Sequence, residues 1–164
     1  MLDEWLARLQ KDLSDRFRDK KRDHIIFVGV GNRMRGDDAI GPVLIDLLKG
    51  QVSHAVDAGN VPENYTSAVK RLKPEVIVFI DAVHFDGRPP GYARLLEIED
   101  IEKRRISVHN FSLDVIMGYL KEETGADVFM IGVQPAVVSE VEGLSSGLKL
   151  SLSDLAAIIT AALT

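Results

Sequence analysis

Two carboxylates and one imidazole are the side chains of this sequence whose types and positions are best suited to catalysis or metal binding. Asp38 follows a glycine-rich turn, Asp81 closes a run of five apolar residues, and His109 precedes a predicted helix. A histidine with two carboxylates can ligate a divalent metal and leave coordination positions open. The alternative chemistry is a pair of carboxylates that share a proton and activate water. Either chemistry requires these distant side chains to meet, so their positions in the fold must be established first.

Strand and helix patterns alternate along the chain after residue 24. Apolar runs predict strands at 25–28, 52–56, 76–80, 92–98 and 128–133. Helical spacing predicts helices at 39–49, 62–72, 111–122 and 152–163, with a long loop at 134–150. This alternation predicts an α/β fold with a mostly parallel sheet of about five strands, covered on both faces. The short link before residue 92 suggests that the strand there is an antiparallel edge strand.

The candidate residues are expected at one edge of this sheet. Ligands of open parallel sheets bind beyond the carboxyl ends of the strands. Asp38, Asp81 and His109 all fall at that predicted edge, and a helix entrance there would favour the neutral imidazole that binds metals. Asp57 follows the second strand in a segment that, taken alone, is more typical of a turn.

The neighbouring carboxylates Asp37 and Asp38 allow two interpretations. Either residue could simply cap the helix that follows. Alternatively, one caps the helix while the other projects over the sheet edge, where the helix dipole keeps it ionised and suited to a metal. A dinucleotide site is excluded, because the G-x-G-x-x-G pattern needs glycine where Met34 stands.

An amphipathic helix is expected at 2–20, ahead of the first strand. Its apolar stripe either docks on the core or meets a partner, and docking is favoured because such stripes are usually core. The 164 residues are expected to form one α/β domain, with an additional helical segment at 2–22 and a core at 24–164.

Composition excludes several classes of function. The 25 acidic and 20 basic residues give a net charge of −5, which argues against a nucleic-acid partner. The chain has no cysteine, so disulfides, thiolate nucleophiles and cysteine metal sites are excluded. No apolar run approaches the roughly 20 residues that span a bilayer, and the acidic start is no secretory signal. We therefore expect a cytoplasmic protein without membrane insertion.

Five motifs in order resemble the hydrogenase maturation endopeptidases. The first is Gly-Val-Gly-Asn at 29–32 followed by Gly-Asp-Asp-Ala-Ile-Gly at 36–41. The others are the segments at 57–64, 78–82, 107–110 and 131–135. The resemblance covers about residues 24–160. The Pro-Glu-Asn and Gln-Pro details at 62–64 and 134–135 are most similar to the subgroup serving formate-hydrogenlyase-type hydrogenases.

The resemblance implies a three-layer α/β/α sandwich and a specific reaction. Family members remove a C-terminal extension from the large-subunit precursor of a [NiFe]-hydrogenase after nickel insertion. Their acidic residue after the first strand, which is Glu in some relatives, corresponds to Asp38. Their aspartate after the third strand and histidine before the next helix correspond to Asp81 and His109. The helix at 2–20 departs from the family pattern and bears on the oligomeric state, for which a monomer is favoured.

Roles follow from combining the residues with the resemblance. Asp38 and Asp81 are expected to polarise a water near the scissile carbonyl, and His109 to complete a site that senses a divalent metal, nickel presented by the substrate. Substrate contacts are expected from Asp57, Asn32 and Gln134. Whether catalysis is aspartic-type or metal-assisted, and whether the protein holds a metal of its own, stays open at this point. The alternatives are a non-catalytic, metal-sensing maturation chaperone and an unrelated metal-dependent hydrolase of small molecules.

Overall fold

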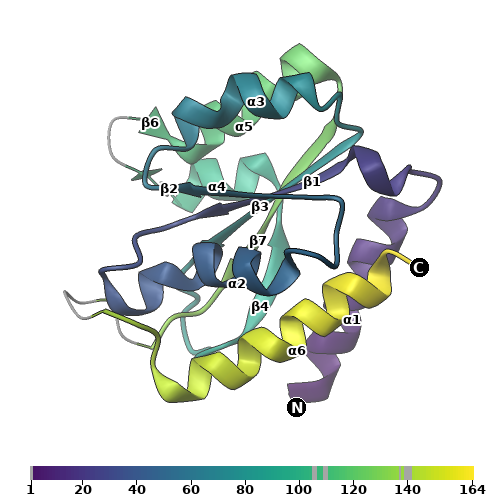
Figure 1. Ribbon diagram of the computed structural model, residues 1–164. Coiled ribbons are helices and arrows are strands. Elements are labelled where there is room, and N and C mark those ends of the chain that lie inside the picture. Colours follow the sequence, from purple (N-terminus) through teal and green to yellow (C-terminus); the bar gives the residue numbers. More distant parts are fainter. Residues whose placement is uncertain (1, 105–106, 109–110, 137, 139–141) are drawn as a thin grey trace.

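A five-stranded sheet forms the centre of the protein (Figure 1). The structure, a computed structural model, describes residues 2–104, 107–108, 111–136, 138 and 142–164. The strand order is β2-β1-β3-β7-β4. The strands are β1 (Ile25–Val30), β2 (His54–Gly59), β3 (Val76–Ala82), β4 (Ala93–Leu96) and β7 (Asp127–Val133). The first four in this order are parallel, and β4 pairs antiparallel with β7 at one edge, which confirms the predicted sheet.

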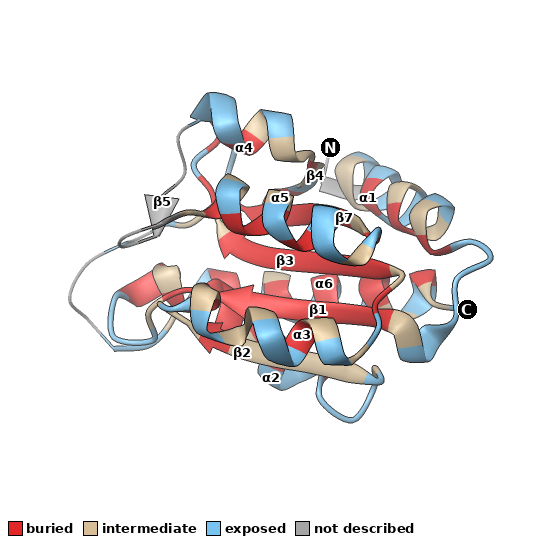
Figure 2. Ribbon diagram, turned by 90° about the horizontal axis from the view of Figure 1, so that it is seen from above, coloured by how far each residue is buried: buried red, intermediate tan, exposed pale blue. Residues whose placement is uncertain are grey.

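Helices cover both faces of this sheet and complete a three-layer α/β/α sandwich (Figure 2). One face packs against α1 (Leu2–Phe17), α2 (Ile40–Leu48) and α6 (Ser146–Ala162). The other face packs against α3 (Thr66–Arg71), α4 (Ile98–Arg104) and α5 (Leu113–Thr124). Strands β1 and β3 are buried on both faces, which is why their sequences are continuously apolar.

Shorter elements connect these layers. They are the 3₁₀ turns η1 (Arg22–His24), η2 (Gly36–Ala39) and η3 (Pro62–Tyr65), and the paired strands β5 (Ser107–Val108) and β6 (Phe111–Ser112). Among the described residues, no helix is long and apolar enough to cross a membrane.

The N-terminal helix docks on the core, as its apolar stripe predicts. Leu9, Leu13 and Phe17 are buried, and the Phe17 ring meets Phe27 edge-on at 6.0 Å between ring centroids. At the end of the helix, Arg16 binds the Asp127 carboxylate with two hydrogen bonds of 2.7 and 2.8 Å. This helix is therefore part of the layer that covers the sheet.

Several sequence-based boundaries were wrong, and one helix was missed. The strand expected at 92–98 is shorter, because β4 ends at Leu96 and α4 begins at Ile98. Strand β2 runs from His54 to Gly59 rather than over 52–56, and helix α6 begins at Ser146, so part of the expected 134–150 loop is helical. Helix α4 was not predicted, because its seven residues contain only two apolar positions. A signal for it exists: the Asp100 carboxylate accepts a hydrogen bond from the Glu97 backbone N–H at 2.9 Å, which is typical of a helix start.

Helix α2 approaches the sheet more closely than any side chain would allow. A Cβ atom on Gly41 would clash with the backbone carbonyl oxygens of Val30 and Ile80. On the preceding turn, Gly31 has φ of 147°, and a Cβ there would clash with the carbonyl oxygen of Asp38. These two glycines let η2 and α2 lie directly against the ends of β1 and β3.

Replacing Gly41 with alanine should therefore destabilise the protein strongly. We expect Gly41→Ala to lower the free energy of unfolding by about 2 kcal/mol or more, because backbone atoms must move to admit the methyl group. Gly118 on α5 is the matched control, since a Cβ there meets nothing within 4 Å. Gly118→Ala should raise the free energy of unfolding by about 0.5–1 kcal/mol. Urea denaturation measures both, and similar values for the two variants would contradict this packing.

Candidate active site

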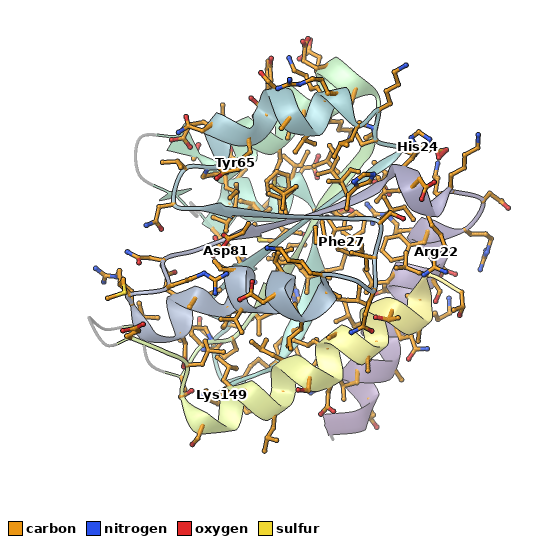
Figure 3. The ribbon with its side chains drawn as sticks, in the orientation of Figure 1. Arg22, His24, Phe27, Tyr65, Asp81 and Lys149 are labelled. Atoms are coloured by element: carbon orange, nitrogen blue, oxygen red, sulfur yellow. The ribbon has the colours of Figure 1, made fainter. Side chains whose placement is uncertain are left out.

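The carboxyl ends of the parallel strands gather the predicted site residues at one edge of the sheet. Asp38 lies on η2 after β1, Asp57 lies near the end of β2, and Asp81 is the next-to-last residue of β3 (Figure 3). Asn32 lies two positions after the end of β1, and Gln134 directly follows β7. His109 lies outside the described residues, so its position relative to the carboxylates stays a prediction.

Asp81 is a buried carboxyl group. Asp81 is only 5% exposed, and one of its carboxylate oxygens accepts a hydrogen bond from the Ala82 backbone N–H at 2.8 Å. Burial raises the pKa of Asp81 well above its ordinary value, the negative charge of Asp38 raises it further, and the Ala82 hydrogen bond opposes both effects. The protonated form is thus favoured, and this group can donate a proton where an ordinary aspartate cannot.

Asp38 lies close enough to Asp81 for its charge to act on that group, and it is held by the turn before α2. It is half-buried, and its carboxylate accepts a hydrogen bond from the Asn32 backbone N–H at 3.0 Å. Asn32 is itself oriented by a 2.8 Å hydrogen bond from the Met34 N–H to its side-chain oxygen. The charge of Asp38 thus acts on Asp81, and their direct approach stays a prediction. Two carboxyl groups with different environments can divide the tasks of acid and base.

Asp37 has a different environment from its neighbour. It is fully buried, and its carboxylate accepts hydrogen bonds from the Ala136 N–H at 2.8 Å, the Ser145 N–H at 2.8 Å and the Ser145 hydroxyl at 2.9 Å. The helix-capping interpretation is wrong, because the N-caps of η2 and α2 have no side-chain cap hydrogen bond. Asp37 instead ties the turn after β1 to both ends of the segment between β7 and α6.

An arginine that the sequence reasoning missed neutralises Asp57. The guanidinium of Arg33 lies 2.8 Å from a carboxylate oxygen of Asp57 and 2.8 Å from one of Asp46 on α2. Hydrogen bonds to Asp46 and then Asp57 raise the pKa of Arg33 above its ordinary value. The two aspartates lie 13 and 24 positions from Arg33, so no local sequence pattern indicates this bridge, which joins β2 to α2 beside the Asn32 turn.

Gln134 uses its side-chain amide within the protein. The residue is 5% exposed, and its side-chain oxygen accepts a 2.5 Å hydrogen bond from the Phe85 backbone N–H. Its amide nitrogen donates to the Pro135 carbonyl oxygen at 3.1 Å and lies 3.2 Å from the His84 ring nitrogen Nδ1. Gln134 therefore holds the segment after β3 against the end of β7, and its contact with substrate stays a prediction.

The donor types at this edge fit a divalent ion, but the set is incomplete in the described part of the chain. Carboxylate and imidazole groups suit nickel and zinc. Within the described ranges, no three histidine, cysteine, aspartate or glutamate side chains are arranged to hold a metal. Since His109 lies outside those ranges, metal ligation stays a prediction.

Comparison with known proteins identifies the family. The hydrogenase maturation protease family HycI matches residues 45–162. The hydrogenase 3 maturation protease of Escherichia coli strain K12 is 33% identical over 117 residues, covering 69% of this chain and 74% of that protein. This chain belongs to the hydrogenase maturation protease family. The predicted resemblance is confirmed, and the family is one of hydrolases that cleave peptide bonds.

Solved structures of hydrogenase maturation proteases have the same fold. The crystal structure of a [NiFe] hydrogenase maturation protease, HycI from Thermococcus kodakarensis KOD1, is 33% identical with a TM-score of 0.82. The similarity covers 93% of this chain and 98% of that chain. The solution structure of an endopeptidase HycI from Escherichia coli is 28% identical with a TM-score of 0.73, covering 84% of this chain and 89% of that one.

The two neighbouring aspartates should respond differently to the same substitution. In Asp37→Asn, an amide NH₂ would face backbone and hydroxyl donors, so we expect the free energy of unfolding to fall by about 2–3 kcal/mol. Asp38→Asn keeps an oxygen for the Asn32 N–H and removes a charge beside Asp81, so its change should stay within about 1 kcal/mol. Urea denaturation of both variants is the measurement. An equal loss in both would contradict the separate environments described above.

The raised pKa of Asp81 should appear in the pH dependence of stability. The folded protein keeps a proton that the unfolded chain releases near pH 4, so stability falls as pH rises from there toward the raised pKa. Asp81→Asn cannot titrate, so its stability relative to the unaltered protein should increase as pH is raised from 4 to 7. Denaturation curves at each pH test this, with Asp154→Asn on α6 as a control. A constant difference between Asp81→Asn and the unaltered protein would contradict it.

Proposed function

We propose that this chain is the endopeptidase that removes the C-terminal extension of a [NiFe]-hydrogenase large-subunit precursor after nickel insertion. Family membership supports the proteolytic reaction, and similarity to a hydrogenase 3 maturation protease supports a hydrogenase precursor as partner. The observation that carries the proposal is that Asp38 and Asp81 both lie at the carboxyl edge of the sheet, where the charge of Asp38 raises the pKa of Asp81. Peptide hydrolysis needs a base for water and an acid for the substrate, and this pair offers both.

The two carboxyl groups divide the work as an aspartic-type pair. Asp38 takes a proton from a water molecule, whose oxygen attacks the scissile carbonyl carbon. Asp81, whose pKa burial raises, gives its proton to the carbonyl oxygen. The proton on Asp38 then passes to the leaving nitrogen as the carbon–nitrogen bond breaks, and a proton of the diol returns to Asp81. Both groups thus regain their starting states.

Nickel belongs to the substrate in this proposal. Carboxylate and imidazole are suitable ligands for a divalent nickel ion, so His109 together with Asp38 and Asp81 would contact the metal of a loaded precursor. A precursor without nickel offers no positive charge to these carboxylates and would be held less well. This arrangement would make cleavage depend on earlier nickel insertion.

Residues beside the pair shape the same edge. Asn32 donates its backbone N–H to Asp38, and Asp57 with Arg33 borders this turn. We assign Asn32 and Asp57 to the wall that contacts the precursor. Gln134 would act on the substrate through the segment that it holds against β7.

Removing either carboxylate should abolish processing. Purified protein is incubated with its nickel-loaded cognate precursor, and mass spectrometry follows the shortened large subunit. We expect Asp38→Asn and Asp81→Asn each to lower the cleavage rate at least 100-fold, because general acid–base groups contribute about 10²–10⁴-fold. His109→Ala should also abolish processing, because it removes the imidazole that would contact the nickel of the precursor. Melting temperatures should stay close to that of the unaltered protein, and Asp154→Asn serves as the control for a lost exposed carboxylate.

Three outcomes would contradict the proposal. An unshortened large subunit with the unaltered protein would favour a metal-sensing chaperone, whereas hydrolysis of generic amides or phosphate esters would favour a small-molecule hydrolase. Wild-type cleavage rates in Asp38→Asn and Asp81→Asn would show that the catalytic groups lie elsewhere.

A further inference from the structure

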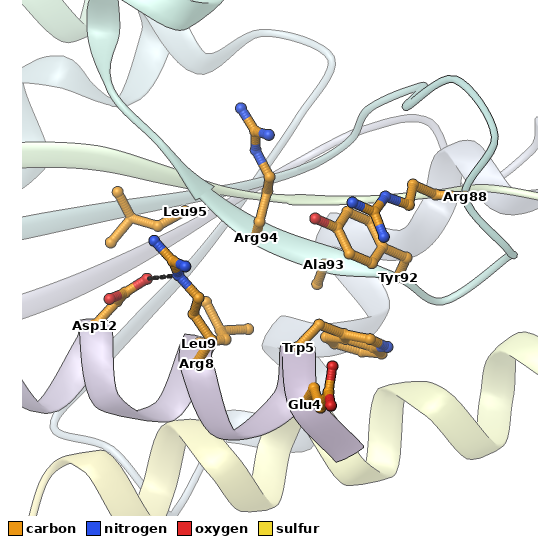
Figure 4. A pocket seen from close by; sticks show the side chains of 10 residues that line it. All are labelled: Glu4, Trp5, Arg8, Leu9, Asp12, Arg88, Tyr92, Ala93, Arg94 and Leu95. Carbon is orange, nitrogen blue, oxygen red and sulfur yellow. Dashed lines mark ion pairs between the residues drawn. The ribbon is translucent and has the colours of Figure 1, made fainter. Parts of the chain in front are cut away.

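A cleft of about 580 Å³ lies along the outer edge of β4, with helix α1 as its floor (Figure 4). This volume is within the range of about 300–1,000 Å³ that is usual for ligand sites. Trp5 and Arg8 rise from α1 toward the strand, Arg94 lies on the far side of β4, and Arg88 and Tyr92 close one end. None of these residues belongs to the candidate active site.

The strand that borders this cleft has an open edge. In the described part of the chain β4 pairs only with β7, on one side, and it is the last strand in the sheet order. The backbone N–H and C=O groups that alternate along its other side therefore face the cleft. Such an edge binds extended peptides by adding them as a further strand.

The cleft lies next to the proposed catalytic pair. Asp81 on β3 is in register with Gly132 on β7, and Gly132 is in register with Arg94 on β4. Because neighbouring strands lie about 4.8 Å apart, the backbones at Asp81 and Arg94 are separated by about 10 Å. An extended chain that rises about 3.3 Å per residue covers this separation in roughly three residues. A peptide cleaved at Asp81 therefore needs at least about three residues beyond the scissile bond to reach the β4 edge. It needs more where it passes around β7 and the side chains of Val83 and Phe85 beside Gly132.

The cleft carries positive charge in an acidic protein. Arg88 and Arg94 lie over the rings of Tyr92 and Phe85, at 4.6 and 5.4 Å from the ring centroids. No carboxylate of the described residues lies within 4.0 Å of either guanidinium, whereas Arg8 is 4.0 Å from Asp12. Arginines that are stacked on rings in this way are oriented and still able to bind a carboxylate.

We propose that this cleft binds the C-terminal extension of the precursor as an added β-strand, with Arg88 and Arg94 binding its carboxylates, including the terminal one. The inference rests on the proposed function, because it names where that enzyme holds its substrate's tail. The backbone of β4 supplies affinity for any extended chain, and the two arginines select a chain that ends nearby in a free carboxylate.

Trp5 makes the proposal directly measurable. It is the only tryptophan of the chain, and its ring lies 5.5 Å from that of Tyr92 inside the cleft. The probe is a synthetic peptide with the sequence of the cognate extension and a free terminal carboxylate. We expect a saturable change in tryptophan fluorescence on titration. Amidation of the peptide terminus, or the double variant Arg88→Glu, Arg94→Glu, should weaken binding at least tenfold.

Cleavage kinetics separate this proposal from the proposed function. With nickel-loaded precursor, Arg88→Glu, Arg94→Glu should raise KM at least tenfold and leave kcat within about twofold, because both arginines are exposed and outside the catalytic pair. Arg22→Glu on η1 is the matched control and should behave as the unaltered protein.

Different results overturn the two proposals. Unchanged Trp5 fluorescence with the free-acid peptide, equal binding of its amidated form, or an unaltered KM in the double variant would overturn the tail-binding cleft. A failure of the unaltered protein to cleave the loaded precursor would overturn the proposed function, and the peptide titration would still decide whether the cleft binds the tail.

Discussion

The burial of the Asp81 carboxyl group near the negative charge of Asp38 is the constraint on which this account depends. Asp81 is the next-to-last residue of a strand that is buried on both faces, so it has little contact with water, and the negative charge of Asp38 acts on it. Left to themselves such groups would move apart or into solvent. The protein holds these groups in place because η2, which carries Asp38, and β3, which carries Asp81, belong to a region where backbone packs directly against backbone.

Three features provide that rigidity. Gly31 and Gly41 allow η2 and α2 to lie against the ends of β1 and β3. Asp37 holds η2 to the segment between β7 and α6 through hydrogen bonds to Ala136 and Ser145. Arg33 joins α2 to β2. Asp37 and Asp38 are adjacent in sequence but have different roles. Asp37 holds η2 in place through its hydrogen bonds, whereas Asp38 belongs to the candidate site itself.

The sequence predicted the sheet, both helical layers and the edge at which the site lies, because burial on both faces leaves a pattern of continuous apolar strands. It also predicted that β4 is an antiparallel edge strand. It could not assign Asp37, whose partner Ser145 lies 108 positions away, and a carboxylate before a helix has the same local pattern as a cap. The Arg33 bridge and the cleft beside Trp5 depend likewise on contacts between distant segments. Of the predicted triad, Asp38 lies within range for its charge to act on Asp81, and the convergence of the three side chains, with His109, stays a prediction.

The central claim is tested most directly by the titration of Asp81 itself. Carboxyl-carbon NMR of protein labelled at aspartate can follow this group between pH 3 and 9 in the unaltered protein and in Asp38→Asn. We predict that Asp81 titrates well above the ordinary aspartate range and that the Asp38 substitution lowers its pKa toward that range, because one of the two causes of the shift is removed. An Asp81 that titrates near pH 4 in both proteins would contradict the account.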